Sequence, residues 1–164
     1  MPLQDRVILD MQIDFEEFFT HKIPAIIDSI KGDEPAKWGL MTVHHMLEHL
    51  VLPLNFAIGT LPMSTMIAEE KIPRQLAFLA SEYGLPKNFK PAFLPSDKTL
   101  PLMYADIVQS KQLLKDTIVK FLASVNATTF ANATHPFYGP LDKTGWLQFQ
   151  YKHFIHHFSQ FGLL

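Results

Sequence analysis

The sequence contains no cysteine, which excludes disulfides, thiolate nucleophiles, zinc ribbons and iron–sulfur clusters together. Clustered positive charge is also lacking: the formal net charge is −2 and the lysines are scattered, so nucleic acid is not an expected partner. No uncharged apolar run approaches the roughly 18 residues of a membrane span, and residues 1–10 lack the pattern of a signal peptide. We therefore expect a cytoplasmic protein that does not bind a membrane.

The sequence does contain enough apolar residues for a folded core. Of its 164 residues, 48% are hydrophobic and 18% are charged. A disordered chain needs the opposite balance, and this length suits one domain rather than two. We expect a single globular domain over residues 1–164.

Apolar residues recur at helical spacing in four segments. Pro24 interrupts the first segment, which is expected to be kinked or split, and Pro53 is expected to bend the second. Gly32 is a natural stop for the first segment. Thr42 and Gly59 are the expected ends of the second, and Asp142 is the expected cap of the fourth. The segments cover about residues 13–30, 42–59, 102–125 and 143–161, with Met103 expected on the inner face of the third.

The stretch from residue 61 to residue 101 is broken by six prolines. It is expected to be an ordered crossover with one short helix at about residues 74–82, closed by Gly84, and residues 132–141 are expected to form a loop. Amphipathic helices must bury their apolar stripes against one another. The sequence therefore predicts an all-α fold, a four-helix bundle with a long crossover between its second and third helices.

The eight histidines are concentrated in two of the expected helices. His153 and His157 are four residues apart, so both imidazoles lie on one face of the fourth helix and can reach one ion. A helical projection places His156 further toward solvent. His49 borders the apolar face of the second helix and is the natural third ligand. His45 and His49 form a pair of their own, so the ligand set could also be exchanged.

Three neutral imidazoles from two helices would cover one side of a divalent ion. The other side would stay open for water or substrate, as a catalytic metal requires. Without a thiolate or an identified carboxylate ligand, zinc, nickel and ferrous iron all remain candidates.

Four other residues near this face have alternative interpretations. Glu48 is next to His49 in the sequence but points about 100° away from it around the helix, so we expect a solvated or outer-shell group rather than a ligand or a general base. His135 and Tyr138 precede the fourth helix and could reach the mouth of the site, although packing within the loop is favoured. Trp146 is expected to be a core residue that could also line a pocket.

The same residues resemble the DinB/YfiT-like superfamily of bacterial metal-binding four-helix bundles, in a branch of unassigned function. In that superfamily one metal histidine comes from the second helix and two, spaced H-x-x-x-H, come from the fourth. The resemblance assigns these roles to His49, His153 and His157, in agreement with the projection. His45 departs from the pattern, because a glutamine is expected there, and it leaves an exchanged or fourth ligand open. The resemblance is carried by residues 38–42, 45–50, 86–88, 135–139, 146, 151–158 and 160–162.

Characterised members of the superfamily include thiol-dependent transferases and isomerases, and others are described as metal-dependent hydrolases. The resemblance thus implies a metal-dependent hydrolase or transferase, with a low-molecular-weight thiol as a further cofactor and an unidentified small molecule as substrate. The alternative is a non-catalytic module that binds a metal or a small molecule. A third hypothesis is a homodimer formed through exposed helix faces, as in some relatives.

Overall fold

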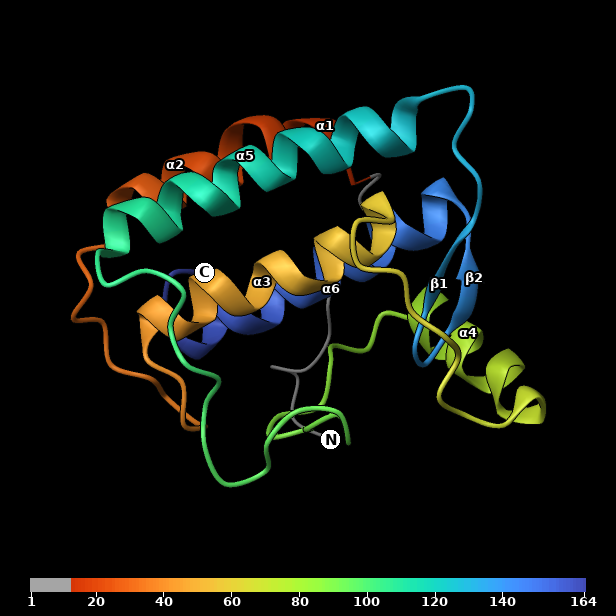
Figure 1. The fold of residues 1–164 in the computed structure, drawn as a ribbon, viewed down its shortest axis with the longest axis horizontal. Coiled ribbons are helices and arrows are strands. Elements are labelled where there is room, and N and C mark those ends of the chain that lie inside the picture. The colour runs from red at the N-terminus through yellow and green to blue at the C-terminus, as the bar shows by residue number, and fades with distance from the viewer. Residues whose placement is uncertain (1–12) are drawn as a thin grey trace.

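The computed structural model describes residues 13–164, and the signal-peptide prediction for residues 1–10 lies outside them. The described chain is mostly helical, with one small antiparallel sheet. In Figure 1, the N-terminal helix and α5 (Ile107–Asn126) run side by side above α3 (Val43–Ile58) and α6 (Lys143–Gln160). The predicted helical class is therefore confirmed, whereas the finer assignment to a DinB-like four-helix bundle stays a prediction.

The first predicted helix is continuous but not uniform. It consists of α1 (Phe15–Glu17), a π-helical turn (Phe18–Lys22) and α2 (Ile23–Ser29), which follow one another directly. Asp14 caps it by accepting a hydrogen bond from the backbone N–H of Glu17 at 2.9 Å. Proline has no N–H to donate, and here Pro24 is the second residue after the wider π-helical turn. The irregularity expected at this proline thus takes the form of a π-helical turn.

Helix α3 has the ends that the sequence predicts. The Thr42 hydroxyl accepts a hydrogen bond from the backbone N–H of His45, and Gly59 ends the helix in the left-handed conformation, with φ 86°. Pro53 lies inside the helix and is buried. The bend expected at this proline stays a prediction.

The crossover contains a 3-10 turn (Glu69–Lys71) that leads directly into α4 (Ile72–Ala80). The predicted bounds of this helix, 74–82 with closure at Gly84, are wrong by two residues at each end. The Lys152 ammonium donates to the carbonyls of Phe78, Ser81 and Tyr83, at 2.7–3.0 Å. Because this side chain from α6 satisfies carbonyls at the end of α4, the helix needs no glycine to close it.

Helix α5 begins five residues later than predicted. Its cap is Asp106, whose carboxylate accepts from the N–H of Val108 at 2.9 Å. Met103, expected on the inner face, lies before the helix and is 60% exposed. The backbone N–H groups of Met103 and Tyr104 donate to the buried Glu48 carboxylate instead, which holds this segment in a loop.

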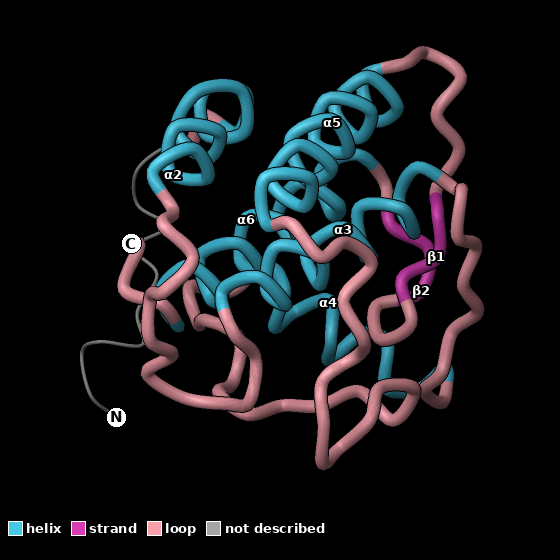
Figure 2. The backbone as a smooth tube through the Cα atoms, turned by 60° about the vertical axis from the view of Figure 1, so that its left-hand side comes forward, coloured by secondary structure: helices cyan, strands magenta, loops and turns pink. Residues whose placement is uncertain are grey.

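The segment before α6, predicted to be a loop, contains a β-hairpin. Strand β1 (Ala133–His135) pairs with β2 (Gly139–Leu141), and the hairpin packs against α3 (Figure 2). Three-residue strands are too short to show the alternation that marks a strand in a sequence. Asp142 caps α6 as predicted, accepting from the N–H of Gly145 at 2.8 Å.

The core is formed by the inner faces of the long helices. It is rich in aromatic side chains, and Phe19 packs edge-on against Phe121 of α5 and Phe154 of α6. Trp146 is fully buried and donates from its indole N–H to the carbonyl of Ala133, which ties α6 to the hairpin. Among residues 13–164, no helix is long and apolar enough to cross a membrane.

Candidate metal centre

Helix α3 carries His49, and α6 carries His153 and His157 on the face that meets it. The Nε2 atom of His153 lies 3.2 Å from that of His49 and 3.1 Å from that of His157. The ligand atoms of the three residues all lie within 4.8 Å of one another. The structure therefore brings together the three histidines that the sequence analysis selected.

This donor set fits a divalent ion. Nitrogens bound to one ion at about 2.0–2.1 Å in a tetrahedral arrangement lie roughly 3.3 Å apart, close to the separations of 3.2 Å and 3.1 Å from Nε2 of His153 to those of His49 and His157. A neutral imidazole has only one N–H, so three facing Nε2 atoms cannot all be satisfied by hydrogen bonds to one another. A cation between them would satisfy all three lone pairs at once.

Burial keeps these imidazoles neutral. It lowers the pKa of His49 to about 4, with a smaller effect from the charge of His156. Burial, followed by the charges of the neighbouring histidines, also places the pKa values of His153 and His157 well below the ordinary range. The neutral form is the one that can bind a metal, so these three imidazoles are in the protonation state that a metal site requires at physiological pH.

The outer ring nitrogens of the two α6 ligands differ in their surroundings. The Nδ1 atom of His157 lies 2.9 Å from Oε1 of Gln160, whose Nε2 donates to the carbonyl of Trp38 at 2.7 Å. The Nδ1 atom of His153 is buried without a hydrogen-bond partner within residues 13–164. His153 instead stacks on Phe149, with ring centroids 5.3 Å apart.

The two other candidate ligand histidines lie outside this group. The Nδ1 atom of His45 is 2.8 Å from the Thr42 hydroxyl, and its Nε2 atom is 3.2 Å from the Thr99 hydroxyl. His156 is partly exposed, as the projection predicts, and its ring packs edge-on against Trp38. Neither residue is among the three whose ligand atoms converge.

Glu48 is buried, so of the two alternatives predicted for it, the solvated side chain is wrong. The prediction that it is not among the converging ligand candidates agrees with its position outside that group. Its carboxylate accepts hydrogen bonds from the N–H groups of Met103 and Tyr104 and from the hydroxyl of Ser110, at 2.6–3.1 Å. Burial raises the pKa of Glu48, but these hydrogen bonds outweigh it and leave the pKa below its ordinary value. The Ser110 hydroxyl also lies 2.8 Å from Nε2 of His44. Because Ser110 is fully buried and donates to Glu48, this cluster fixes the start of α5 rather than presenting a nucleophile.

His135 and Tyr138 are buried beside the hairpin rather than at an open mouth. The Nδ1 atom of His135 accepts a hydrogen bond from the N–H of Phe137 at 3.1 Å. Burial lowers the pKa of His135 to about 3 and raises that of Tyr138 to about 12. Both rings pack against Phe149, the residue that stacks on His153. Their contacts agree with the packing role that the sequence favoured.

Sequence reasoning missed several polar residues of α6. Gln160 bonds to His157, Lys152 anchors α4, and the carboxamide of Gln150 is fully buried without a partner in the described chain. Gln150 and Gln160 each lie three residues from a candidate ligand, at a spacing that places side chains on one helix face. That spacing was the signal in the sequence from which their position beside the candidate ligands could have been predicted.

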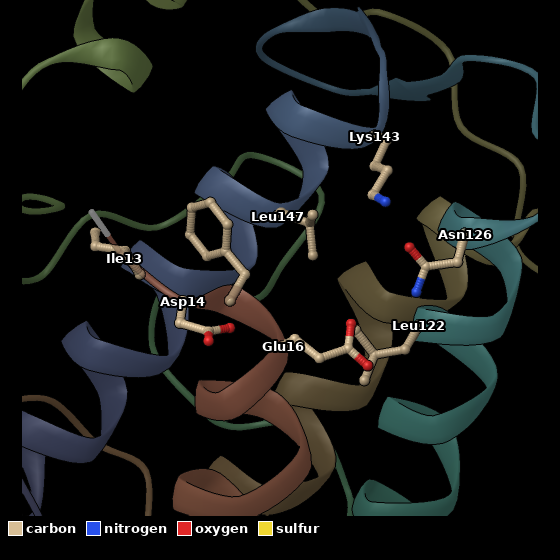
Figure 3. Close-up of a pocket in the computed structure, with 8 residues that line it drawn as sticks. Ile13, Asp14, Glu16, Leu122, Asn126, Lys143 and Leu147 are labelled. Atoms are coloured by element: carbon tan, nitrogen blue, oxygen red, sulfur yellow. The ribbon is translucent and has the colours of Figure 1, made fainter.

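A pocket of about 480 Å³ lies where the start of the N-terminal helix meets the end of α5 and the beginning of α6 (Figure 3). Apolar side chains and the charged groups of Asp14, Glu16 and Lys143 line it. None of the three converging histidines does. The pocket lining is Ile13, Asp14, Phe15, Glu16, Leu122, Asn126, Lys143 and Leu147.

The chain was compared with protein families, curated proteins and solved structures. A family model described as a protein of unknown function (DUF1569) matches residues 95–162. The matched range includes His153 and His157 but not His49. No curated protein and no solved structure matches the chain.

Proposed function

We propose that the protein is a metal-dependent enzyme in which His49, His153 and His157 hold one divalent ion. The observation that carries this proposal is the convergence of three neutral imidazole nitrogens from two helices. His49 is partly exposed, whereas the other two ligands are buried, so approach to the ion is expected from the His49 side. Imidazole ligands suit zinc, nickel and ferrous iron better than magnesium or calcium.

The expected reaction is that of a hydrolase or a thiol-dependent transferase. A metal held by three histidines would supply a Lewis acid that polarises a carbonyl or lowers the pKa of a bound water or thiol. The protein's contribution is to hold three neutral nitrogens in place and to limit water around them. The reaction class and the thiol cofactor rest on the resemblance to the DinB/YfiT-like four-helix bundles. The helical fold and the converging histidines are compatible with that resemblance.

The second candidate is a non-catalytic module that binds metal or a small molecule. It is favoured by the low exposure of His153 and His157, 8% and 7%. A metal enclosed in this way would be stabilising rather than reactive. Exchange of labelled water at the bound ion distinguishes the two candidates, because a catalytic metal has an open position and an enclosed one does not.

Self-association through exposed helix faces is a further proposal. Val108 and Val119 lie three helical turns apart on α5 and are 63% and 67% exposed. Such a face could meet a second copy of the chain, giving a homodimer. Light scattering over a range of concentrations tests this proposal, and a constant monomer mass would contradict it.

Elemental analysis of untagged protein tests the metal proposal. We expect near-stoichiometric metal in the wild type and its loss from the folded His49→Ala and His157→Ala variants. His21→Ala is the matched control, because His21 is exposed and bonds to Thr20. Wild-type protein that takes up no zinc, nickel or ferrous iron, or alanine variants that keep their metal, would refute the proposal.

A further inference from the structure

The side-chain amide of Gln160 has its orientation fixed by a backbone carbonyl. Its Nε2 atom lies 2.7 Å from the carbonyl oxygen of Trp38. A carbonyl only accepts hydrogen bonds, so the amide NH₂ must face it. The opposite orientation would place two oxygens in contact inside the protein. The amide oxygen of Gln160 must therefore face His157.

This orientation determines which nitrogen of His157 carries the proton. Oε1 of Gln160 lies 2.9 Å from Nδ1 of His157 and can only accept, so Nδ1 must donate. A neutral imidazole has one N–H, and with the proton on Nδ1 its Nε2 keeps a free lone pair. That lone pair is directed at the other converging histidines, because Nε2 of His157 lies 3.1 Å from Nε2 of His153.

Gln160 is buried and is itself held by the turn at residues 37–39. It is 3% exposed, and its backbone carbonyl accepts a hydrogen bond from the N–H of Lys37 at 2.8 Å. Gly39 adopts φ +80°, and a Cβ atom there would lie only 2.8 Å from Nε2 of Gln160. The turn at residues 37–39 therefore docks closely on this side chain, and glycine is the residue that permits the approach.

We propose that Gln160 is a positioning residue that fixes His157 in the tautomer with the proton on Nδ1, and that the Trp38-Gly39 turn locks Gln160 in this role. Hydrogen bonds to the outer nitrogen of a metal-binding histidine set its tautomer and ring orientation. The inference rests on the proposed metal site for its function. The tautomer itself is a property of the metal-free protein and can be measured alone.

The test is long-range ¹H–¹⁵N NMR of histidine-labelled, metal-free protein near pH 7.5, with His157 assigned from the His157→Ala variant. We expect Nδ1 of His157 to be protonated in the wild type. Gln160→Met fills similar space but accepts no strong hydrogen bond, so the proton should redistribute toward Nε2. Gln160→Glu keeps an accepting oxygen and should retain the wild-type tautomer, even though the Trp38 carbonyl loses its donor. Gln112→Met is the control, since Gln112 is exposed on α5 and its side chain donates to Asp116.

Zinc titration of the same proteins gives the second readout. Loss of an outer-shell partner typically weakens metal binding about 10-fold to 100-fold, which we expect for Gln160→Met but not for Gln160→Glu. A proton on Nε2 of His157 in the wild type, or an unchanged tautomer and affinity in Gln160→Met, would overturn the inference. If the tautomers behave as expected but the wild type binds no zinc, the positioning role stands and the proposed function fails.

Discussion

Burial, more than any charged neighbour, determines the protonation of single histidines in this protein. The pKa of His49 is lowered to about 4, and those of His153 and His157 are well below the ordinary value. An unfolded histidine has a pKa of about 6.5, so below that pH the unfolded chain binds protons that the folded chain does not. The contribution of these histidines to the stability of the metal-free protein is therefore complete above about pH 6.5 and decreases as the pH falls below that value.

Denaturant unfolding of chelator-treated protein at pH 7.5 and pH 5.0 checks this prediction. Each histidine that is neutral when folded and charged when unfolded contributes a slope of about 1.4 kcal/mol per pH unit. We expect a clearly lower free energy of unfolding at pH 5.0. The drop should be smaller in His49→Phe, which removes one of these groups. Equal stability at the two pH values would contradict the account.

Glu48 illustrates what residue-level reasoning could and could not predict. The projection correctly separated Glu48 from His49, because positions on a helix follow from its periodicity. It could not reveal that the carboxylate is buried, because its partners Met103, Tyr104 and Ser110 are 55 to 62 residues away. The role of Gln160 was not predicted for the same reason, since the carbonyl that orients its side chain belongs to Trp38, 122 residues earlier.

The Glu48→Ala substitution would leave the N–H groups of Met103 and Tyr104 without their acceptor. An unsatisfied buried donor costs about 1–3 kcal/mol. We therefore expect a loss of roughly 2–4 kcal/mol in the free energy of unfolding. Glu70→Ala, at an exposed carboxylate, should change it by less than about 0.5 kcal/mol. A Glu48→Ala protein as stable as this control would show that the hydrogen bonds of Glu48 contribute nothing to the free energy of unfolding.

At the scale of elements, the helix ends predicted from Thr42, Gly59 and Asp142 are confirmed, whereas the start of α5 at Asp106 and the end of α4 were placed wrongly. Thr42, Gly59 and Asp142 act within a few residues of themselves, and each occupies its predicted place. The start of α5 depends on Glu48 and the end of α4 on Lys152, which are distant in sequence. The β-hairpin was not predicted, because strands of three residues each are too short to show a strand pattern in the sequence.

Lys152→Met tests the role of the buried lysine at the end of α4. The methionine retains apolar contacts but removes the Lys152 donor from the carbonyls of Ser81 and Tyr83. The Phe78 carbonyl also loses Lys152 but keeps the backbone N–H and the hydroxyl of Ser81 as donors. We expect a loss of about 2–3 kcal/mol in the free energy of unfolding and faster hydrogen exchange confined to α4. Lys120→Met is the control, because Lys120 is exposed on α5. Unchanged exchange in α4 would show that another contact holds the helix.

At the scale of the whole molecule, the candidate site joins segments that the chain keeps far apart. His49 and His153 are 104 residues apart, and the crossover with α4 lies between α3 and α5. Histidine spacing and helical periodicity selected these three histidines as candidate ligands, with His45 left open as an alternative, because each signal depends on only one helix. Their convergence required the packing of α3 against α6. An ion bound there would link the two helices, and it would bind the folded state alone.

The most direct test is a crystal structure of zinc-loaded protein, with anomalous diffraction data collected at the zinc absorption edge. The account predicts one strong anomalous peak, about 2.0–2.1 Å from the Nε2 atoms of His49, His153 and His157. The Nδ1 atom of His157 should remain bonded to Gln160. A peak at His45 or His156 instead, or the lack of any peak between the three histidines at saturating zinc, would contradict the central claim.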